Sequence, residues 1–269
     1  MPNWRELLAA SGLPRLEAQL LAARGAGVKR SWLLAHEADE VVPEAALAVG
    51  ALHARRQAGE PIAYILGERE FFGLELAVTP DVLIPRPETE LLVELARAHL
   101  PEGGRLLDIG TGSGAIAVTI AHMRADARVW ACDVSPAALA IARLNAARHA
   151  PQVHCVKSDL FAALPGERFD VIASNPPYVA SSDPHLAEGD LRFEPKLALE
   201  AGPDGMAVIR RIAADARQHL KPGGILVFEH GHDQGAASRE LLVVLGYDSV
   251  NDYNDLSSIP RVCVGRWKG

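Results

Sequence analysis

The stretch "RLLDIGTGSGAIA", residues 105–117, places a short apolar run directly before a glycine-rich turn and a helical segment. A short apolar run of this kind is typical of a strand in a parallel sheet. Glycines at 110, 112 and 114 let the backbone turn sharply and approach a ligand where a Cβ atom would clash. The stretch therefore predicts a strand, a ligand-binding turn and a helix in direct succession.

The same alternation of strand and helix continues toward the C-terminus. Further short apolar runs lie at 128–133, 153–157, 169–174 and 224–230, and helical stretches separate most of them. This pattern predicts an α/β fold in which helices cover both faces of a parallel sheet and ligands bind at the carboxyl ends of its strands. No helix separates "GYDSVNDYNDL" from "RVCVGRW" near the C-terminus, so we expect an antiparallel hairpin there.

The first part of the chain follows a different pattern. It is rich in Ala, Leu and Arg at helical spacing, which predicts a small helical bundle. The stretch "FFGLELAVTPDVLIP" then alternates apolar and polar residues, as a hairpin does. We therefore expect a helical domain at residues 1–72 that contributes substrate docking, a β-hairpin linker at 73–87 and the α/β domain at 88–269.

Composition, charge and residue spacing argue against a membrane protein, a broad nucleic-acid-binding surface, a disulfide framework and a metal site. Of the 269 residues 49% are hydrophobic, and the net charge of -7 argues against a broad surface that neutralises phosphates. No stretch approaches the ~18 apolar residues that a membrane span requires, so we expect a cytoplasmic protein without membrane contact. The three cysteines lack CxxC spacing, which predicts buried thiols in a reducing compartment. His230 and His232 lack further ligands at usable spacing, so we expect no metal site and place both in a surface loop.

Acidic residues follow the next two predicted strands. Asp133 ends the second run, where a carboxylate can accept both hydroxyls of an adenosine ribose. After the third run, Asp159 is placed to accept from an adenine amino group, and Leu160 to pack on the ring. With the glycine turn, three successive strand ends thus predict an adenosine-containing cofactor. NAD and S-adenosylmethionine both contain adenosine, so these residues leave the choice between them open.

The fourth predicted strand leads into "SNPPY", residues 174–178. Amide and aromatic-amine nitrogens are poor nucleophiles because their lone pair is delocalised, so methyl transfer to them requires orientation. The Asn175 side-chain oxygen and the Pro176 carbonyl can each accept one N–H, Tyr178 can stack on the planar group, and two prolines stiffen the loop. Dehydrogenases and kinases have no use for an amide acceptor at this place, so the loop favours S-adenosylmethionine.

Several of these stretches together resemble a known family. "LDIGTGSGAIA", "CDVSPAAL", "SDLF" and "SNPPYV" are similar to the motifs of class I S-adenosylmethionine-dependent methyltransferases with an Asn-Pro-Pro-Tyr signature. Residues 82–90, 193–212 and 220–235 resemble the HemK/PrmC family, which modifies the glutamine of the Gly-Gly-Gln (GGQ) tripeptide in peptide chain release factors at its side-chain amide nitrogen. The resemblance in motifs is close over about residues 60–268. The N-terminal part resembles the family only in being helical.

This resemblance implies a class I methyltransferase Rossmann-like fold, S-adenosylmethionine as cofactor with S-adenosylhomocysteine as product, and release factors as partners in translation termination. The implied cofactor-binding residues are Gly110, Thr111, Gly112, Ser113, Gly114, Asp133, Asp159, Leu160 and Asn175. The implied catalytic residues are Asn175, Pro176 and Tyr178, and substrate contacts add Pro177, Arg86 and Glu88. Some relatives carry a Trp in place of Leu160, which implies slightly weaker adenine packing here. Glu88 fits equally well as a first-turn residue of a helix.

Three other functions are compatible with parts of the pattern. A glutamine methyltransferase of a ribosomal protein shares the loop Asn175–Tyr178, which we call the reacting loop. Such enzymes tend to depart from the sequence "PETE", which this chain retains at residues 87–90. An N6-adenine nucleic-acid methyltransferase uses the same asparagine chemistry but needs a basic cleft, which a net charge of -7 does not favour. A binding module without catalysis would first lose the reacting loop, which is intact. We therefore expect release factor modification without direct nucleic-acid binding.

Overall fold

The computed structural model describes residues 1–269, which form two compact units. Unit 1 comprises Met1–Glu68 together with Glu188–Phe193, and unit 2 comprises Arg69–Ala187 and Glu194–Gly269. The chain therefore leaves unit 2 for one short stretch, residues 188–193, and then returns to it. We call this stretch the inserted segment.

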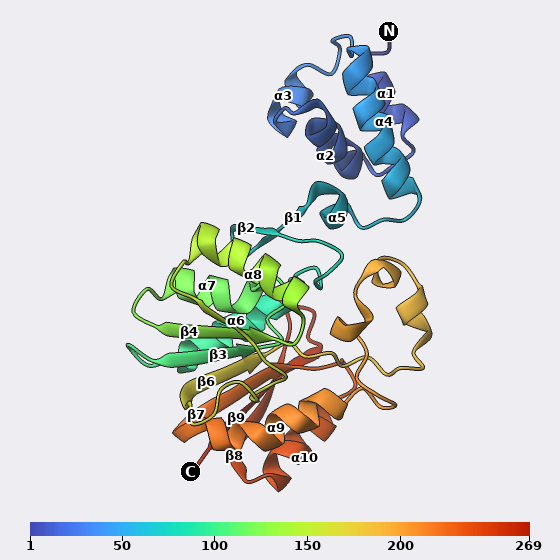
Figure 1. The fold of residues 1–269 in the computed structure, drawn as a ribbon. Helices are drawn as coiled ribbons and strands as arrows, with labels where there is room; N and C mark the ends of the chain where they lie inside the picture. The colour runs from blue at the N-terminus through green and yellow to red at the C-terminus, as the bar shows by residue number, and fades with distance from the viewer. The chain divides into compact units, whose positions relative to one another are not determined.

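Unit 1 is a bundle of short helices, which confirms the helical N-terminal region predicted from sequence (Figure 1). Its first helix begins with a reciprocal cap, in which Asn3 accepts from the Glu6 backbone N–H and the Glu6 side chain accepts from that of Asn3. Its core contains Trp4, Leu33 and Val49, all of them buried. The helices are α1 (Trp4–Ala10), α2 (Arg15–Ala26), α3 (Arg30–Ala35), α4 (Pro43–Gln57) and α5 (Ile62–Leu66).

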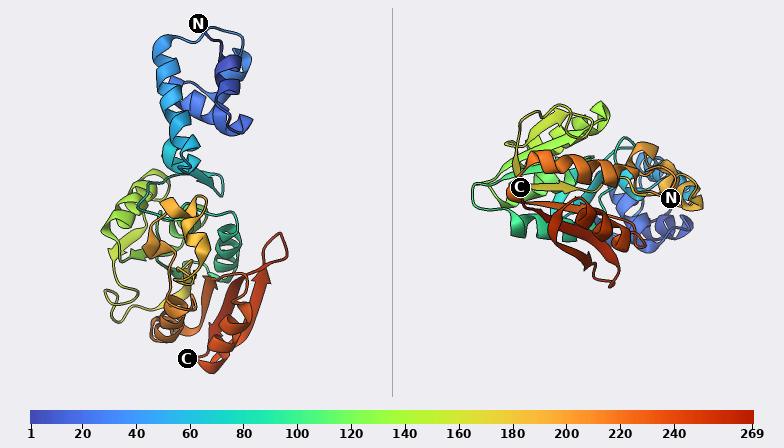
Figure 2. Two further views of the ribbon diagram at one scale, coloured as in Figure 1. Left: turned by 90° about the vertical axis from the view of Figure 1, so that its right-hand side faces the viewer. Right: turned by 90° about the horizontal axis from the view of Figure 1, so that it is seen from below.

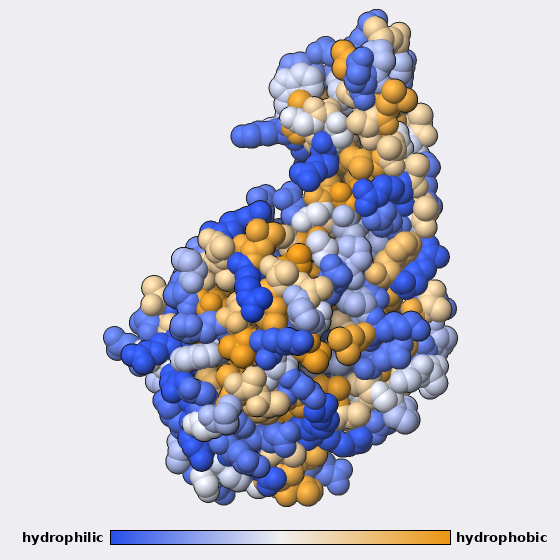
Figure 3. Space-filling view, in the orientation of Figure 1, coloured by the Kyte–Doolittle hydropathy of each residue, from blue (hydrophilic) through white to orange (hydrophobic).

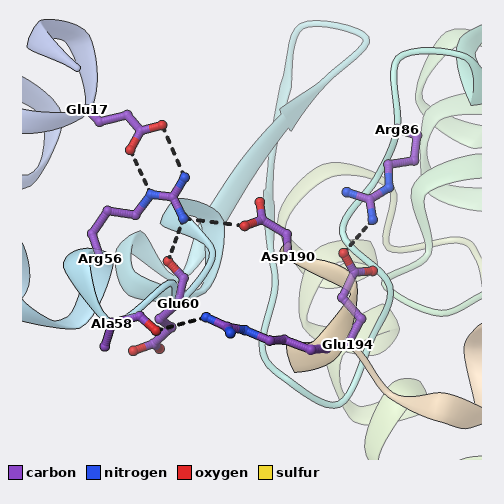
Figure 4. Close-up of polar contacts among 8 residues, drawn as sticks. Glu17, Arg56, Ala58, Glu60, Arg86, Asp190 and Glu194 are labelled. Carbon is purple, nitrogen blue, oxygen red and sulfur yellow. Dashed lines mark hydrogen bonds and ion pairs between the residues drawn. The ribbon is translucent and has the colours of Figure 1, made fainter. Parts of the chain in front are cut away.

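The inserted segment is held in unit 1 by two arginines (Figure 4). Arg56 of α4 donates through Nε to Glu17 Oε2 at 2.7 Å and through Nη1 to Asp190 Oδ1 at 3.3 Å. In the other direction, Arg192 donates through Nη2 to the Ala58 carbonyl at 3.0 Å. A bundle side chain thus binds a side chain of the inserted segment, and an arginine of the segment binds a backbone carbonyl of the bundle.

The hairpin that follows unit 1 lies earlier in the chain than expected. Its strands are β1 (Glu68–Phe71) and β2 (Leu74–Ala77), and residues 78–87 contain no strand. Phe72 and Gly73 form the turn between them with φ angles of 54° and 77°. A two-residue turn with positive φ at both positions matches the twist of a hairpin, so pairing begins on both sides of it. The predicted range 73–87 therefore misses the first strand and covers only the last turn residue, the second strand and the loop after it.

Unit 2 is built on a seven-stranded sheet with the order β5-β4-β3-β6-β7-β9-β8. The first five strands are mutually parallel, whereas β9 runs antiparallel to β7 and pairs with β8 in a C-terminal hairpin, red in Figure 2. The mostly parallel sheet and the terminal hairpin are thus confirmed. The strands are β3 (Arg105–Ile109), β4 (Arg128–Asp133), β5 (His154–Lys157), β6 (Phe169–Ser174), β7 (Leu220–Glu229), β8 (Tyr247–Asn254) and β9 (Pro260–Trp267).

Helices cover both faces of this sheet because side chains of both faces are apolar. Leu106 of β3 packs in one core with α6 (Thr89–His99), α7 (Ala115–Met123) and α8 (Pro136–His149). Its neighbour Leu107 packs in the opposite core, with α9 (Ala207–His219) and α10 (Gly235–Val244). Figure 1 shows α7 and α8 on one side of the strands and α9 and α10 on the other. No helix combines the length and the hydropathy needed to cross a membrane.

The chain between β6 and α9 contains only short 3-10 turns. They are η1 (Pro184–Ala187), η2 (Leu191–Phe193) and η3 (Lys196–Ala198), of which η2 belongs to the inserted segment. Most of this connection is therefore positioned by contacts to other parts of the chain rather than by its own regular structure.

The prediction that His230 lies in a surface loop is wrong. Its side chain is completely buried at the end of β7, with Nε2 at 3.0 Å from Asp252 Oδ1 and Nδ1 at 2.8 Å from the Gly231 carbonyl. Asp252 lies on β8, so only the pairing of distant strands brings the two side chains together. No group of three or more His, Cys, Asp or Glu side chains is placed to hold a metal ion.

The three thiols are free, but they differ in burial. Cys132 and Cys263 are buried, and burial raises the pKa of each to about 12. Cys155 is only half-buried, because β5 is the edge strand of the sheet. The expectation of three buried thiols therefore holds for two of them.

Candidate active site

One cavity of about 410 Å³ lies at the carboxyl ends of β3, β4 and β6, entirely within unit 2. Because parallel strands end at the same edge of a sheet, polar groups that follow different strands meet there. The predicted site residues that line the cavity are Gly110, Thr111, Gly112, Ser113, Asp133, Asp159, Leu160, Asn175, Pro176, Pro177 and Arg86. Three other predicted residues, Gly114, Tyr178 and Glu88, are not among its lining residues.

The surroundings of the three glycines explain why Gly110 and Gly112 line the cavity whereas Gly114 does not. Gly110 and Gly112 have φ angles of 68° and 56°, and a Cβ atom on either would meet no neighbour within 4 Å. Because both residues line the cavity, their missing side chains leave open space for a ligand. Gly114 differs, since its Cβ atom would lie 3.0 Å from Val118 Cγ2. It starts α7 and keeps the turn close to the helix.

Asp108 lies buried beneath this turn. Its Oδ2 accepts from Thr111 Oγ1 at 2.6 Å and from the Ala117 backbone N–H at 3.2 Å. Its Oδ1 has no hydrogen-bond partner, and the side chain is 0% exposed. Burial raises the pKa of Asp108 from 3.8 to about 7, and its hydrogen bonds only partly oppose this. Asp108 was not predicted as a site residue, although its place at the end of β3 could have indicated it.

The raised pKa of Asp108 predicts a specific dependence of stability on pH. Because the native state holds this proton more tightly than the unfolded chain, this group's contribution to the free energy of unfolding falls as pH rises from about 4 to about 7. An Asn at this position stays neutral throughout. Relative to wild type, we therefore expect Asp108→Asn to gain about 2–3 kcal/mol between pH 5 and pH 8, measured by urea unfolding.

The exposed Asp39 offers a matched control for this measurement. Asp39→Asn should show the same difference from wild type at both pH values. A constant difference for Asp108→Asn as well would mean that Asp108 does not change its charge in this range.

Asp133 holds the backbone around the cavity with both carboxylate oxygens. Oδ2 accepts from the Gly112 N–H at 3.0 Å, and Oδ1 accepts from the Ser135 N–H at 2.9 Å. Ser135 in turn caps α8 by accepting from the Ala138 N–H. A carboxylate oxygen can accept more than one hydrogen bond, so Asp133 retains acceptor capacity on the cavity side.

The third strand end places Asp159 and Leu160 at the cavity, but it also brings a cation that was not predicted. Both carboxylate oxygens of Asp159 lie 3.0 Å from Nη2 of Arg211 on α9. The two side chains are 58% and 55% exposed, so solvent weakens this ion pair. Leu160 lies in the left-handed region with a φ of 49°, which turns the chain sharply after β5. Arg211 is distant in sequence from Asp159, and although it lies within the stretch 193–212 that resembles the HemK/PrmC family, it was assigned no role there.

The Asn175 loop is connected to a buried carboxylate. Asn175 Nδ2 donates to Thr89 Oγ1 at 3.0 Å, and Thr89 Oγ1 donates to Glu229 Oε2 at 2.7 Å. The Tyr178 hydroxyl donates to Glu229 Oε1 at 3.1 Å. Burial raises the pKa of both Glu229 and Tyr178. Thr89 and Glu229 were not predicted as site residues, although Glu229 ends an apolar run as Asp108 and Asp133 do.

Backbone pairing holds the chain just after this loop. The Val179 N–H donates to the Leu199 carbonyl, and the Ala201 N–H donates to the Val179 carbonyl, both at 2.9 Å. These bonds form an isolated parallel bridge between residues 179 and 200. The two prolines stiffen the loop itself, so its position is fixed from within and from its C-terminal side.

Arg86 and Glu88 differ in their surroundings. Arg86 lines the cavity, and its Nη2 donates to Oε1 of Glu194, whose side chain is completely buried (Figure 4). Glu88 lies at the start of α6 and makes no capping hydrogen bond through its side chain. The structure therefore brings Arg86 to the cavity wall and leaves Glu88 away from it.

Comparisons with known proteins identify two matching families and several close relatives in sequence. Residues 87–189 match the methyltransferase small domain family, and residues 3–67 match the PrmC N-terminal domain family. The chain is 52% identical to the release factor glutamine methyltransferase of Bordetella pertussis, over 97% of this chain and 98% of that protein. It is 54% identical to that of Burkholderia pseudomallei over 98% and 96%, and 45% identical to that of Escherichia coli over 97% and 95%.

The chain belongs to the release factor glutamine methyltransferase family. The family and the enzyme class predicted from sequence, a protein-glutamine methyltransferase, are thereby confirmed. Solved structures agree on the fold alone. A methyltransferase from Pyrococcus furiosus is 23% identical with a TM-score of 0.57, and covers 81% of this chain and 98% of its own. The Thermus thermophilus 16S rRNA N2 G1207 methyltransferase, solved with AdoMet and guanosine, is 20% identical with the same TM-score of 0.57 and covers 74% and 49%.

Proposed function

We propose that this protein transfers a methyl group from S-adenosylmethionine to the side-chain amide nitrogen of the glutamine in the GGQ tripeptide of release factors. The observation that carries the proposal is Asn175, whose carboxamide is fixed at the wall of a cavity that Gly110, Gly112, Asp133 and Asp159 also line. Membership of the family supports the substrate class. Release factors act on ribosomes, so we place the reaction in the cytoplasm.

The cavity fits S-adenosylmethionine by its own chemistry. Gly110 and Gly112 leave open space beside Thr111 and Ser113, where the methionine part would lie. Asp133 has acceptor capacity for the ribose hydroxyls, whereas Asp159 and Leu160 offer an acceptor and an apolar surface for adenine. When bound, S-adenosylmethionine supplies an electrophilic methyl group on a positively charged sulfur.

The residues of the protein then have to orient a weak nucleophile. The Asn175 side-chain oxygen and the Pro176 carbonyl each accept one N–H of the substrate amide, which holds the nitrogen and favours its pyramidal form. Pro177 keeps the loop stiff, and Tyr178, which does not line the cavity, anchors the end of the loop through its hydroxyl bond to Glu229 rather than offering its ring to the substrate amide. The methylated nitrogen loses its extra proton to water, so the site needs no strong base.

The direct test is a mass measurement on a purified release factor. We expect incubation with enzyme and S-adenosylmethionine to add one methyl group to the GGQ peptide, and a Gln→Ala substrate to gain none. Parallel incubations with ribosomal protein and with duplex DNA examine the other two substrate classes. Methyl transfer to either of these, with none to the release factor, would overturn the proposal.

We propose that unit 1 contributes docking surface for the release factor, because the substrate is a protein loop rather than a free amino acid. Hydrophobic residues reach the surface of both units in Figure 3. The large exposed apolar side chains of unit 1 are Met1, Leu16, Trp32, Leu34, Val42 and Leu47. Large exposed apolar side chains are common contacts in protein interfaces. Unit 1 also contains the inserted segment, so its removal would strip that segment of its partners.

Point substitution on unit 1 therefore tests docking better than truncation does. We expect Leu34→Ser to raise KM for an intact release factor by about 3- to 10-fold, since an apolar contact is worth about 1 kcal/mol. KM for a short GGQ peptide should stay unchanged. Leu256→Ser, at the fully exposed turn between β8 and β9, is the matched control and should change neither value. Equal effects on protein and peptide would exclude a docking role for this side chain.

A further inference from the structure

Glu229 is a buried carboxylate that the reaction described above does not use. It lies at the end of β7 and is 1% exposed. Its two oxygens accept from different elements, Oε2 from Thr89 at the start of α6 and Oε1 from Tyr178 of the reacting loop. A buried carboxylate is costly unless its oxygens are hydrogen-bonded, and here both are.

The direction of each hydrogen bond follows from the number of protons available. When Glu229 is ionised it can only accept, so the Thr89 hydroxyl gives it the single hydrogen that it carries. The 3.0 Å contact between Thr89 Oγ1 and Asn175 must then be one in which Thr89 accepts. The Asn175 group that faces Thr89 is therefore the NH₂, and its oxygen lies on the opposite side of the carboxamide.

We infer that Glu229 and Thr89 are positioning residues, which hold the Asn175 carboxamide with its oxygen available to accept an N–H from the substrate amide. The inference rests on the proposed function, and it explains why a carboxamide with two nearly equivalent orientations serves as an acceptor. A carboxamide turned the other way would present its own N–H groups to those of the substrate. Neither of these two groups could then accept from the other, and the Pro176 carbonyl alone would hold the nitrogen.

We call the hydrogen-bonded series Glu229, Thr89 and Asn175 the relay. Charged groups on neighbouring elements shift the pKa values of Glu229 and of its second donor, Tyr178. Arg261 of β9 favours the ionised form of Glu229, whereas Glu88 before α6 disfavours it. Arg86 and Arg261 both act on Tyr178, the other donor to the carboxylate. Burial outweighs these influences and raises the pKa of Glu229. A protonated Glu229 can donate to Thr89, which frees the Thr89 hydroxyl to donate to the Asn175 oxygen. Turnover should therefore fall as pH decreases through this raised pKa.

Substitutions of equal shape separate this role from simple packing. In Glu229→Gln the new amide can donate to Thr89, and in Thr89→Val the hydroxyl is absent. We expect each to lower kcat by at least ~10-fold, while the dissociation constant of S-adenosylmethionine changes less than about 3-fold. Thr89→Ser keeps the hydroxyl and should retain kcat within about 3-fold. The double variant should be no slower than the slower single variant, because both changes break the same relay.

A second readout does not depend on methyl transfer. In the cofactor-free protein, the side-chain NH₂ protons of Asn175, followed by NMR, should exchange with solvent faster in Thr89→Val than in wild type. The matched control is Thr119→Val, because Thr119 is also buried and its hydroxyl has no partner. It should change neither exchange nor kcat.

Three results would each overturn the inference. The first is unchanged kcat in folded Glu229→Gln and Thr89→Val, and the second is unchanged Asn175 proton exchange in Thr89→Val. Loss of cofactor affinity in proportion to kcat would also overturn it, since that indicates a general disturbance of the site. Failure of wild type to methylate a GGQ peptide would count against the proposed function instead, and the NMR readout would still decide on the relay.

Discussion

Replacing Asn175 with Ala is expected to lower kcat by at least ~10²-fold, the scale on which removal of one oriented polar group acts. The reason is that, in the mechanism we propose, the carboxamide oxygen is one of only two acceptors that hold the substrate nitrogen. Affinity for S-adenosylmethionine should stay within a few-fold, because we propose that the glycine turn, Asp133 at the end of β4 and Asp159 after β5 hold most of the cofactor. Single-turnover kinetics and calorimetric titration of the cofactor measure the two quantities separately.

Asn254→Ala provides the matched control, since Asn254 is exposed on β8 and does not line the cavity. It should leave both quantities unchanged. Turnover of Asn175→Ala within a factor of a few of wild type would show that the role assigned to this side chain is incorrect. A large fall in cofactor affinity would instead assign Asn175 to cofactor binding.

Replacing Asp133 with Ala is expected to weaken binding of S-adenosylmethionine by about 10²-fold. Hydrogen bonds to a charged group contribute about 1.5–3 kcal/mol each, and each ~1.4 kcal/mol corresponds to a tenfold change in affinity. Asp133 also holds the Gly112 N–H, so its loss loosens the turn that approaches the ligand. Isothermal titration of the cofactor into the purified variant checks this value.

Asp159→Ala is the informative comparison for this variant. The Asp159 carboxylate is 58% exposed and already paired with Arg211, so its loss should weaken cofactor binding by less than about 10-fold. Asp133→Asn keeps the shape and one acceptor, and we expect an intermediate loss. If Asp159→Ala weakened binding more than Asp133→Ala did, the assignment of the two carboxylates to ribose and adenine would have to be reversed.

Local sequence was sufficient for the regular elements around the cavity. The runs at 105–109, 128–133 and 169–174 coincide with β3, β4 and β6, because buried strands of a parallel sheet are continuous apolar stretches. The residues directly after these strands could be assigned to one site for the same reason, since parallel strands end at one edge. Most of the predicted cofactor residues do line the cavity.

Contacts between residues far apart in the chain could not be predicted from local sequence. The hairpin begins at Glu68 because a turn at Phe72 and Gly73 sets its register, whereas apolar alternation alone marks only which residues face inward. The inserted segment has no composition that distinguishes it from its neighbours, and it belongs to unit 1 through contacts such as that between Arg56 and Asp190. The burial of His230 could not be predicted from local sequence either, because its partner Asp252 lies on another strand.

The amino-acid sequence by itself determined the α/β sheet, the glycine turn, the acidic strand ends and the identity of the reacting loop, because each depends on residues adjacent in the chain. Only the tertiary structure decided which way the Asn175 carboxamide faces. That orientation depends on a hydroxyl from the start of α6 and a carboxylate from the end of β7, which fold-wide packing brings within hydrogen-bond distance. A hydrogen bond has direction and a short range, so its effect cannot be known before both partners are placed.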